Sequence, residues 1–193
     1  MSGAFFWLII KGEGGKSFVS GADISEFEKI RSTPEGVKMY EHTSNHMYQG
    51  LKDCAKATIA MIEGYCMGGG IALACACDFR ICSQDAIFAV PAARLGICYG
   101  PNFTRWVVEA VGLSSAKEIL MTARRYSAEE AHDIGLVNHL VENSEIEDFT
   151  IQYATTIVKN APLSVLAAKT IASQISKISG DWDQELCSEW MKR

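Results

Sequence analysis

The sequence has no excess of positive charge. Its 193 residues contain 18 lysine and arginine residues against 23 aspartate and glutamate residues, which gives a formal net charge of −5. Nucleic-acid backbones are bound mainly by clustered basic side chains. The composition therefore disfavours a nucleic-acid partner.

The sequence also lacks a long hydrophobic run. The longest early apolar stretch, Ala4–Ile10, is too short to span a bilayer, and no basic segment precedes it. We therefore expect neither a membrane span nor a signal peptide. This places the chain in the cytoplasm, or in an organelle matrix if its source is eukaryotic.

Paired cysteine motifs are missing too. The seven cysteines are odd in number and form no C-x-x-C pair. Most of them lie within apolar runs, which is typical of reduced core residues. The pair His42 and His46, four residues apart, fits a solvated helix face better than a zinc site. We predict no metal.

The order of apolar runs and helix caps predicts an α/β core followed by a helical C-terminal part. With 48% hydrophobic and 21% charged residues, the chain has the composition of an ordinary globular domain, and no composition shift marks a second one. The expected strands are Phe5–Lys11, Ala57–Ile62, Phe79–Ser83, Ile87–Ala89 and Leu136–Val141. The expected helices are one capped by Asp23, one from Pro34 to about Cys54, Ile71–Ala76, Asn102–Val111, Ser114–Met121, Ser127–Ile134, one capped by Ser144 that ends near Asn160, and Pro162–Ile178.

Residues 64–78, GYCMGGGIALACACD, place three glycines in a turn between a strand and an apolar helix. Glycines at such a turn favour anion binding, because the free N–H groups of a helix N-terminus point outward. A P-loop would need a lysine and a hydroxyl residue after the glycines, and the G-x-G-x-x-G dinucleotide pattern is not met. Upstream, residues 16–27, KSFVSGADISEF, offer a second free amide, at Ala22.

These stretches together resemble the enoyl-CoA hydratase/isomerase family, also called the crotonase superfamily. The similarity rests on FVSGADI at 18–24, GYCMGGGIALACACD at 64–78, FAVPAARLGI at 88–97 and LMTARRYSAEEAHDIGLVNHLV at 120–141. It implies a spiral of ββα units, with residues 1–141 as the core and 142–193 as a helical part of the same domain. It also implies assembly as a homotrimer or a pair of trimers.

The resemblance implies that the N–H groups of Ala22 and Gly69 form an oxyanion hole. The hole would bind the thioester carbonyl of an acyl-CoA and stabilise the enolate that develops there. Coenzyme A would enter as part of this substrate, and no permanently bound cofactor is expected. The further residues expected along the CoA and acyl path are Lys16, Ser20, Asp23, Ile24, Gly68 and Ala92.

Both proton-transfer carboxylates of the family's hydratases are missing. The matching positions are Ala72 and Ala92. Because alanine cannot accept or donate a proton, ordinary enoyl-CoA hydration should be slow or absent.

Three interpretations remain open. The chain is an enzyme that uses the oxyanion hole for another reaction, such as a decarboxylation in which Tyr99 supplies the proton. Alternatively, it is a non-catalytic or regulatory binder of CoA thioesters, or an interaction subunit that binds no ligand. Other candidate acids are Asp23, Glu26 and Glu109, and Arg94 is a candidate partner for a substrate carboxylate.

The family has a strand–helix–strand segment before a stretch like residues 5–18 and a helix after one like residues 182–193. Neither is present in the sequence. We expect the chain to be a fragment or a shortened family member.

Overall fold

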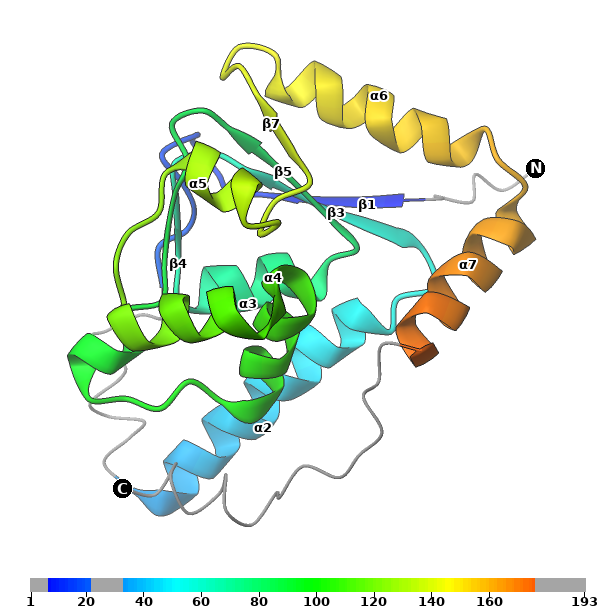
Figure 1. Cartoon of the computed structure of the whole chain (residues 1–193). Coiled ribbons are helices and arrows are strands. Elements are labelled where there is room, and N and C mark those ends of the chain that lie inside the picture. Colours follow the sequence, from blue (N-terminus) through cyan, green and yellow to red (C-terminus); the bar gives the residue numbers. More distant parts are fainter. Residues whose placement is uncertain (1–6, 22–32, 176–193) are drawn as a thin grey trace.

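Two parallel β-sheets form the centre of the computed structural model, which describes residues 7–21 and 33–175 (Figure 1). The four-stranded sheet has the order β1-β3-β5-β7, and the three-stranded sheet has the order β2-β4-β6. The strands are β1 (Trp7–Lys11), β2 (Ser17–Val19), β3 (Ala57–Ile62), β4 (Tyr65–Met67), β5 (Phe79–Ser83), β6 (Ile87–Ala89) and β7 (His139–Val141). The helices are α2 (Pro34–Lys52), α3 (Gly69–Ala76), the 3₁₀-helix η1 (Pro91–Leu95), α4 (Pro101–Thr122), α5 (Ala128–Asp133), α6 (Ile146–Val158) and α7 (Pro162–Ile175).

The chain alternates between the two sheets. β3 in the larger sheet is followed by β4 in the smaller sheet and then by α3, and β5 and β6 are followed in the same way by η1 and α4. Every strand pairing within the two sheets is parallel. The predicted α/β class and the ββα units are confirmed.

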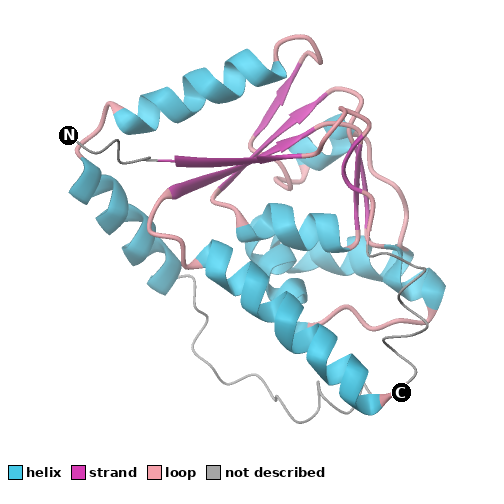
Figure 2. Ribbon diagram, turned by 180° about the vertical axis from the view of Figure 1, so that it is seen from behind, coloured by secondary structure: helices cyan, strands magenta, loops and turns pink. Residues whose placement is uncertain are grey.

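Strand β3 forms the middle of the core. All six of its residues are buried, as a parallel strand covered on both faces requires. Because side chains alternate along a strand, Ile59 and Met61 pack toward α6, whereas Ala60 and Ile62 join the cluster around α3 and α4. Figures 1 and 2 show α6 on one side of the larger sheet and α3 and α4 on the other.

Helix α3 is a central, buried helix. Six of its eight residues are buried, and it packs against α4, α2 and the strands. A helix that is apolar on all sides is stable only where it is enclosed in this way. Its N-terminus is therefore held at a fixed position in the core.

Helix α4 is interrupted at Gly112. This glycine has φ 74° and ψ 168°, and helical backbone continues on both sides of it. The sequence predicts two separate helices here, ending and starting around this glycine, and the break is confirmed. The positive φ is one that glycine adopts without a steric penalty.

Several local predictions were wrong or fall outside the described residues. The sequence predicts no strand at β2 or β4, and β7 covers only the last three residues of the predicted strand Leu136–Val141. The predicted helix start at Ser127 is confirmed, and Ser127 and Glu130 form a capping box there. The predicted Ser144 cap is wrong, because α6 starts after Glu145 without a side-chain cap. The predicted helix capped by Asp23 lies outside the described residues.

The predicted core cysteines are largely confirmed. Cys66, Cys75, Cys77 and Cys82 are buried free thiols, whereas Cys98 is exposed. Burial raises the pKa of Cys77 and of Cys82 to about 12, so both stay protonated and unreactive near neutral pH.

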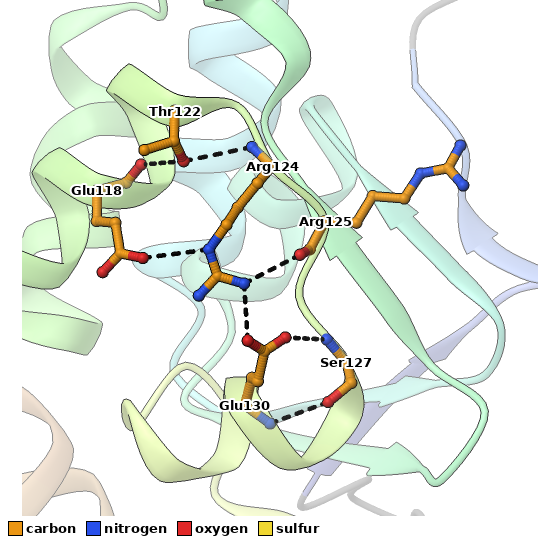
Figure 3. A network of polar contacts seen from close by, with 6 residues as sticks. All are labelled: Glu118, Thr122, Arg124, Arg125, Ser127 and Glu130. Atoms are coloured by element: carbon orange, nitrogen blue, oxygen red, sulfur yellow. Dashed lines mark hydrogen bonds and ion pairs between the residues drawn. The ribbon is translucent and has the colours of Figure 1, made fainter.

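A polar network joins the end of α4 to the start of α5 (Figure 3). The guanidinium of Arg124 donates to Glu118 at 3.1 Å and to Glu130 at 2.7 Å, and it lies 3.6 Å from the centre of the Tyr126 ring. The Glu130 carboxylate also accepts from the N–H of Ser127. The network holds the segment whose backbone pairs with β6.

Asp78 connects three separate parts of the chain. One of its carboxylate oxygens accepts from the N–H of Thr58 at 2.8 Å, from the Thr58 hydroxyl at 3.0 Å and from the Lys169 ammonium at 2.7 Å. It thereby ties the end of α3 to the start of β3 and to α7.

Replacing Asp78 with alanine should destabilise the fold. The buried Thr58 would lose its acceptor, so we expect the free energy of unfolding to fall by about 2 kcal/mol. Urea denaturation measures the change, with the exposed Asp133→Ala as the control. Equal midpoints for wild type and Asp78→Ala would contradict this role.

Candidate active site

A cavity of about 600 Å³ opens at the N-terminus of α3. Three parts of the chain enclose it: the end of β2 with the following turn, one face of α2, and the segment from the end of β6 to the start of α4. Figures 1 and 2 show α2 beside α3 and α4. The lining residues are 19–21, 40, 41, 44, 45, 48, 67–69, 90–92, 95 and 97–103.

A different local constraint favours glycine at each of the three positions 68–70 at this helix start. Gly68 has φ 51° and ψ −108°, a conformation that residues with a Cβ rarely adopt. A Cβ on Gly70 would lie 2.6 Å from the backbone oxygen of Val19, so only glycine lets α3 pack this closely on β2. A Cβ on Gly69 would meet the Tyr48 hydroxyl at 3.1 Å. Gly69 also lines the cavity, so its backbone borders the cavity.

The carbonyl oxygen of Gly68 is held by three donors. It accepts from the N–H groups of Ile71 at 3.0 Å and Ala72 at 3.3 Å, and from the Tyr99 hydroxyl at 3.1 Å. The Gly69 N–H belongs to the same planar, trans peptide unit and therefore points the opposite way. It donates to no acceptor among the described residues. Within the described part of the chain, it is thus a donor without a partner at the positive end of α3.

Two tyrosine hydroxyls flank this helix start. Tyr99 bonds the Gly68 carbonyl, and Tyr48 of α2 donates to the Gly69 carbonyl at 3.3 Å. Burial, with a smaller effect of Tyr40, raises the pKa of Tyr48 to about 12. Burial also raises the pKa of Tyr99 well above its ordinary value. Both phenols are therefore neutral donors over the physiological pH range.

The structure brings part of the predicted site together. Ser20, Gly68, Gly69, Ala92 and Tyr99 all line the cavity. Ala22, Asp23 and Ile24 lie outside the described residues, so the second predicted oxyanion donor is not placed.

Other candidates lie away from the cavity. Lys16 and Arg94 are exposed and are not part of its wall. Glu109 pairs with Lys52 at 2.8 Å and with Arg105 at 3.5 Å, which occupies its carboxylate elsewhere. Of the two positions that match the hydratase carboxylates, Ala72 is fully buried and is not part of the cavity lining, whereas Ala92 lines the cavity.

Sequence reasoning missed the face of α2. Glu41, Ser44, Asn45 and Tyr48 recur at helical spacing and all line the cavity. The spacing itself is visible in the sequence, but nothing there shows which face of α2 meets α3.

Metal and membrane sites have no support in the described part of the chain. It contains no group of three His, Cys, Asp or Glu side chains that could hold a metal ion. Within the same residues, no helix is both long enough and apolar enough to cross a membrane.

Tyr48 should keep its proton at alkaline pH. A free phenol is mostly ionised at about pH 10.5, whereas the Tyr48 pKa is about 12. Folded wild type and Tyr48→Phe should therefore show equal tyrosinate absorbance at that pH, and wild type should absorb more once both are unfolded in guanidinium chloride. Between the ordinary phenol pKa of 10.0 and the Tyr48 pKa of about 12, the unfolded chain binds fewer protons than the folded chain. The Tyr48 hydroxyl therefore makes the free energy of unfolding fall as the pH rises through this range. A tyrosinate difference between the folded proteins would contradict the buried placement.

The chain matches a known family along most of its length. The family model described as Enoyl-CoA hydratase/isomerase matches residues 5–181. The chain is 41% identical over 162 residues to the short-chain-enoyl-CoA hydratase of Clostridium acetobutylicum, a match that covers 84% of this chain and 61% of that protein. It is 30% identical over 194 residues to the peroxisomal Delta(3,5)-Delta(2,4)-dienoyl-CoA isomerase of Arabidopsis thaliana, covering 95% of this chain and 70% of that protein.

A solved structure shares the fold. The enoyl-CoA hydratase/carnithine racemase from Magnetospirillum magneticum superposes with a TM-score of 0.86 at 30% identity, covering 94% of this chain and 68% of that one. The chain spans about three fifths of the length of the clostridial hydratase. The family match, the sequence relatives and the shared spiral agree with the motifs at 18–24 and 64–78, and the chain belongs to the enoyl-CoA hydratase/isomerase family.

Proposed function

We propose that this protein processes acyl-CoA thioesters by stabilising a thioester enolate at the Gly69 N–H. The observation that supports this most is the orientation of the Gly68–Gly69 peptide. Its carbonyl is bonded to three donors, and its N–H is left without an acceptor among the described residues at the wall of a cavity. The named relatives, a hydratase and an isomerase, both carry CoA substrates in their names.

In this proposal the thioester oxygen accepts from the Gly69 N–H as negative charge develops on it. The predicted second donor is the N–H of Ala22. A donor of this kind typically contributes about 3–4 kcal/mol to transition-state stabilisation, and the positive end of α3 adds to it. The cavity of about 600 Å³ is in the usual size range for an organic ligand.

We also propose that the protein is a poor hydratase. Syn-hydration needs one group to activate water and another to protonate the α-carbon. Ala92 faces the cavity without a proton to transfer, and Ala72 is fully buried.

Tyr99 is proposed to orient the donor peptide. Its hydroxyl already donates to the Gly68 carbonyl, so a role as the acid of a decarboxylation would require that bond to break. Decarboxylation and non-catalytic thioester binding remain predictions from the sequence, as do the trimeric assembly and the division into a core and a helical part.

A panel of CoA thioesters separates these alternatives. Acyl-, enoyl-, malonyl- and methylmalonyl-CoA are titrated by calorimetry, and each mixture is then analysed for products by mass spectrometry. Binding with a product supports an enzyme, and binding without any product supports the regulatory interpretation. Failure of every thioester, and of coenzyme A itself, to bind would overturn the proposal.

Crotonyl-CoA should be hydrated slowly. Without either carboxylate, we expect turnover at least about 100-fold below that of the clostridial short-chain-enoyl-CoA hydratase measured alongside. The loss of the conjugated thioester absorbance measures the rate. A comparable rate for the two proteins would show that another group transfers the protons.

Gly69→Pro should remove the oxyanion donor while keeping the helix. Proline has no N–H and is tolerated in the first turn of a helix. The matched control is Gly69→Ala, which adds a Cβ near the Tyr48 hydroxyl but retains the N–H. We expect turnover of any processed thioester to be about 100- to 1,000-fold lower in Gly69→Pro than in Gly69→Ala.

A spectroscopic readout makes this test independent of turnover. The carbonyl stretch of a bound, isotope-labelled thioester should shift to lower frequency in wild type and Gly69→Ala, because hydrogen bonding weakens the C=O bond. The shift should be smaller in Gly69→Pro. Circular dichroism confirms that both variants fold. Equal shifts in the two variants would exclude Gly69 as the donor.

A further inference from the structure

The wall of the cavity that comes from α2 carries several polar side chains. Glu41 supplies the one carboxylate among the described lining residues, and the same residues include no lysine, arginine or histidine. Glu41 is half-buried and makes no hydrogen bond or ion pair with any described residue. Ser44, one turn further along, adds a hydroxyl. The wall therefore presents unused acceptors to whatever fills the cavity.

The position of Glu41 is fixed relative to the donor at Gly69. Tyr48 anchors the near end of this wall, since its hydroxyl bonds the Gly69 carbonyl. Glu41 lies seven residues earlier on the same face of α2, about 10 Å along the helix axis. Between them, Asn45 accepts a hydrogen bond from Asn102 at 3.4 Å, which joins α2 to the opposite wall at the start of α4.

Gly69 and Glu41 lie at two ends of the α2 wall, so they would contact two different parts of one ligand. In the proposed binding mode, a thioester with its carbonyl at Gly69 extends its acyl chain beside α2, past apolar lining residues such as Leu95, Ile97 and Phe103. At the far end it meets the Glu41 carboxylate. An unpaired carboxylate in a partly dry site favours a hydrogen-bond donor, most strongly a cationic one, and repels another carboxylate.

Resting on the proposed acyl-CoA function, we infer that Glu41 determines acyl specificity: the protein selects thioesters whose acyl group ends in a hydrogen-bond donor, above all a protonated amine. Apolar acyl groups bind more weakly, because they leave the carboxylate desolvated and unpaired. Acyl groups that end in a carboxylate bind most weakly.

Calorimetry with three matched ligands tests this inference. The ligands are CoA thioesters of equal chain length that end in an amine, a methyl group or a carboxylate, and several lengths are compared. We expect the amine-ended thioester to bind about tenfold more tightly than the methyl-ended one, the size of effect expected for a hydrogen bond to a charged group. The preference should peak at one chain length, because Glu41 lies at a fixed distance from Gly69.

The variant Glu41→Gln should abolish the preference while still binding the methyl-ended thioester. The control Glu35→Gln removes a carboxylate from the first turn of the same helix, outside the cavity, and should keep the preference. Equal affinities for the three ligands in wild type would overturn the inference and leave the proposed function standing. A uniform loss of affinity in Glu41→Gln, for coenzyme A as well, would mean that Glu41 contacts the CoA part, which also overturns it. If no thioester binds, both proposals fail.

Discussion

The carbonyl of Gly68 is the group on which the candidate site depends. Two N–H groups of the first turn of α3 and the Tyr99 hydroxyl all donate to its oxygen. Because a peptide unit is rigid, these three bonds also determine the direction of the Gly69 N–H. An oxyanion donor is effective only if it is oriented before the charge develops, since reorganisation would otherwise reduce its contribution. The site is therefore preorganised by ordinary helix geometry and one tyrosine.

The rest of the fold keeps that helix start in place. α3 is buried on nearly all sides, its third glycine packs on β2, and Tyr48 holds the next carbonyl from α2. The two parallel sheets place successive turns of the chain side by side, so that the end of β2, the start of α3 and the segment after β6 meet at one cavity. α2 completes the cavity and adds the polar wall that ends in Glu41.

Much of this could be predicted from the sequence, and the rest depends on tertiary packing. Buried strands such as β3 are visible as apolar runs, and the glycines at 68–70 mark the strand-to-helix turn without any structure. β2 and β4 were missed because three residues are too few to show a periodicity. The position of Tyr48 and Glu41 in the cavity wall was missed because a polar stripe on α2 looks like a solvated face until its packing against α3 is known.

The most direct test is a crystal structure of the full chain with a bound CoA thioester. We expect the thioester oxygen to lie about 3 Å from the backbone nitrogen of Gly69, with the Gly68 carbonyl still bonded to the Tyr99 hydroxyl. A thioester bound with its carbonyl turned away from Gly69, or a Gly69 N–H bonded to another group of the protein, would contradict it.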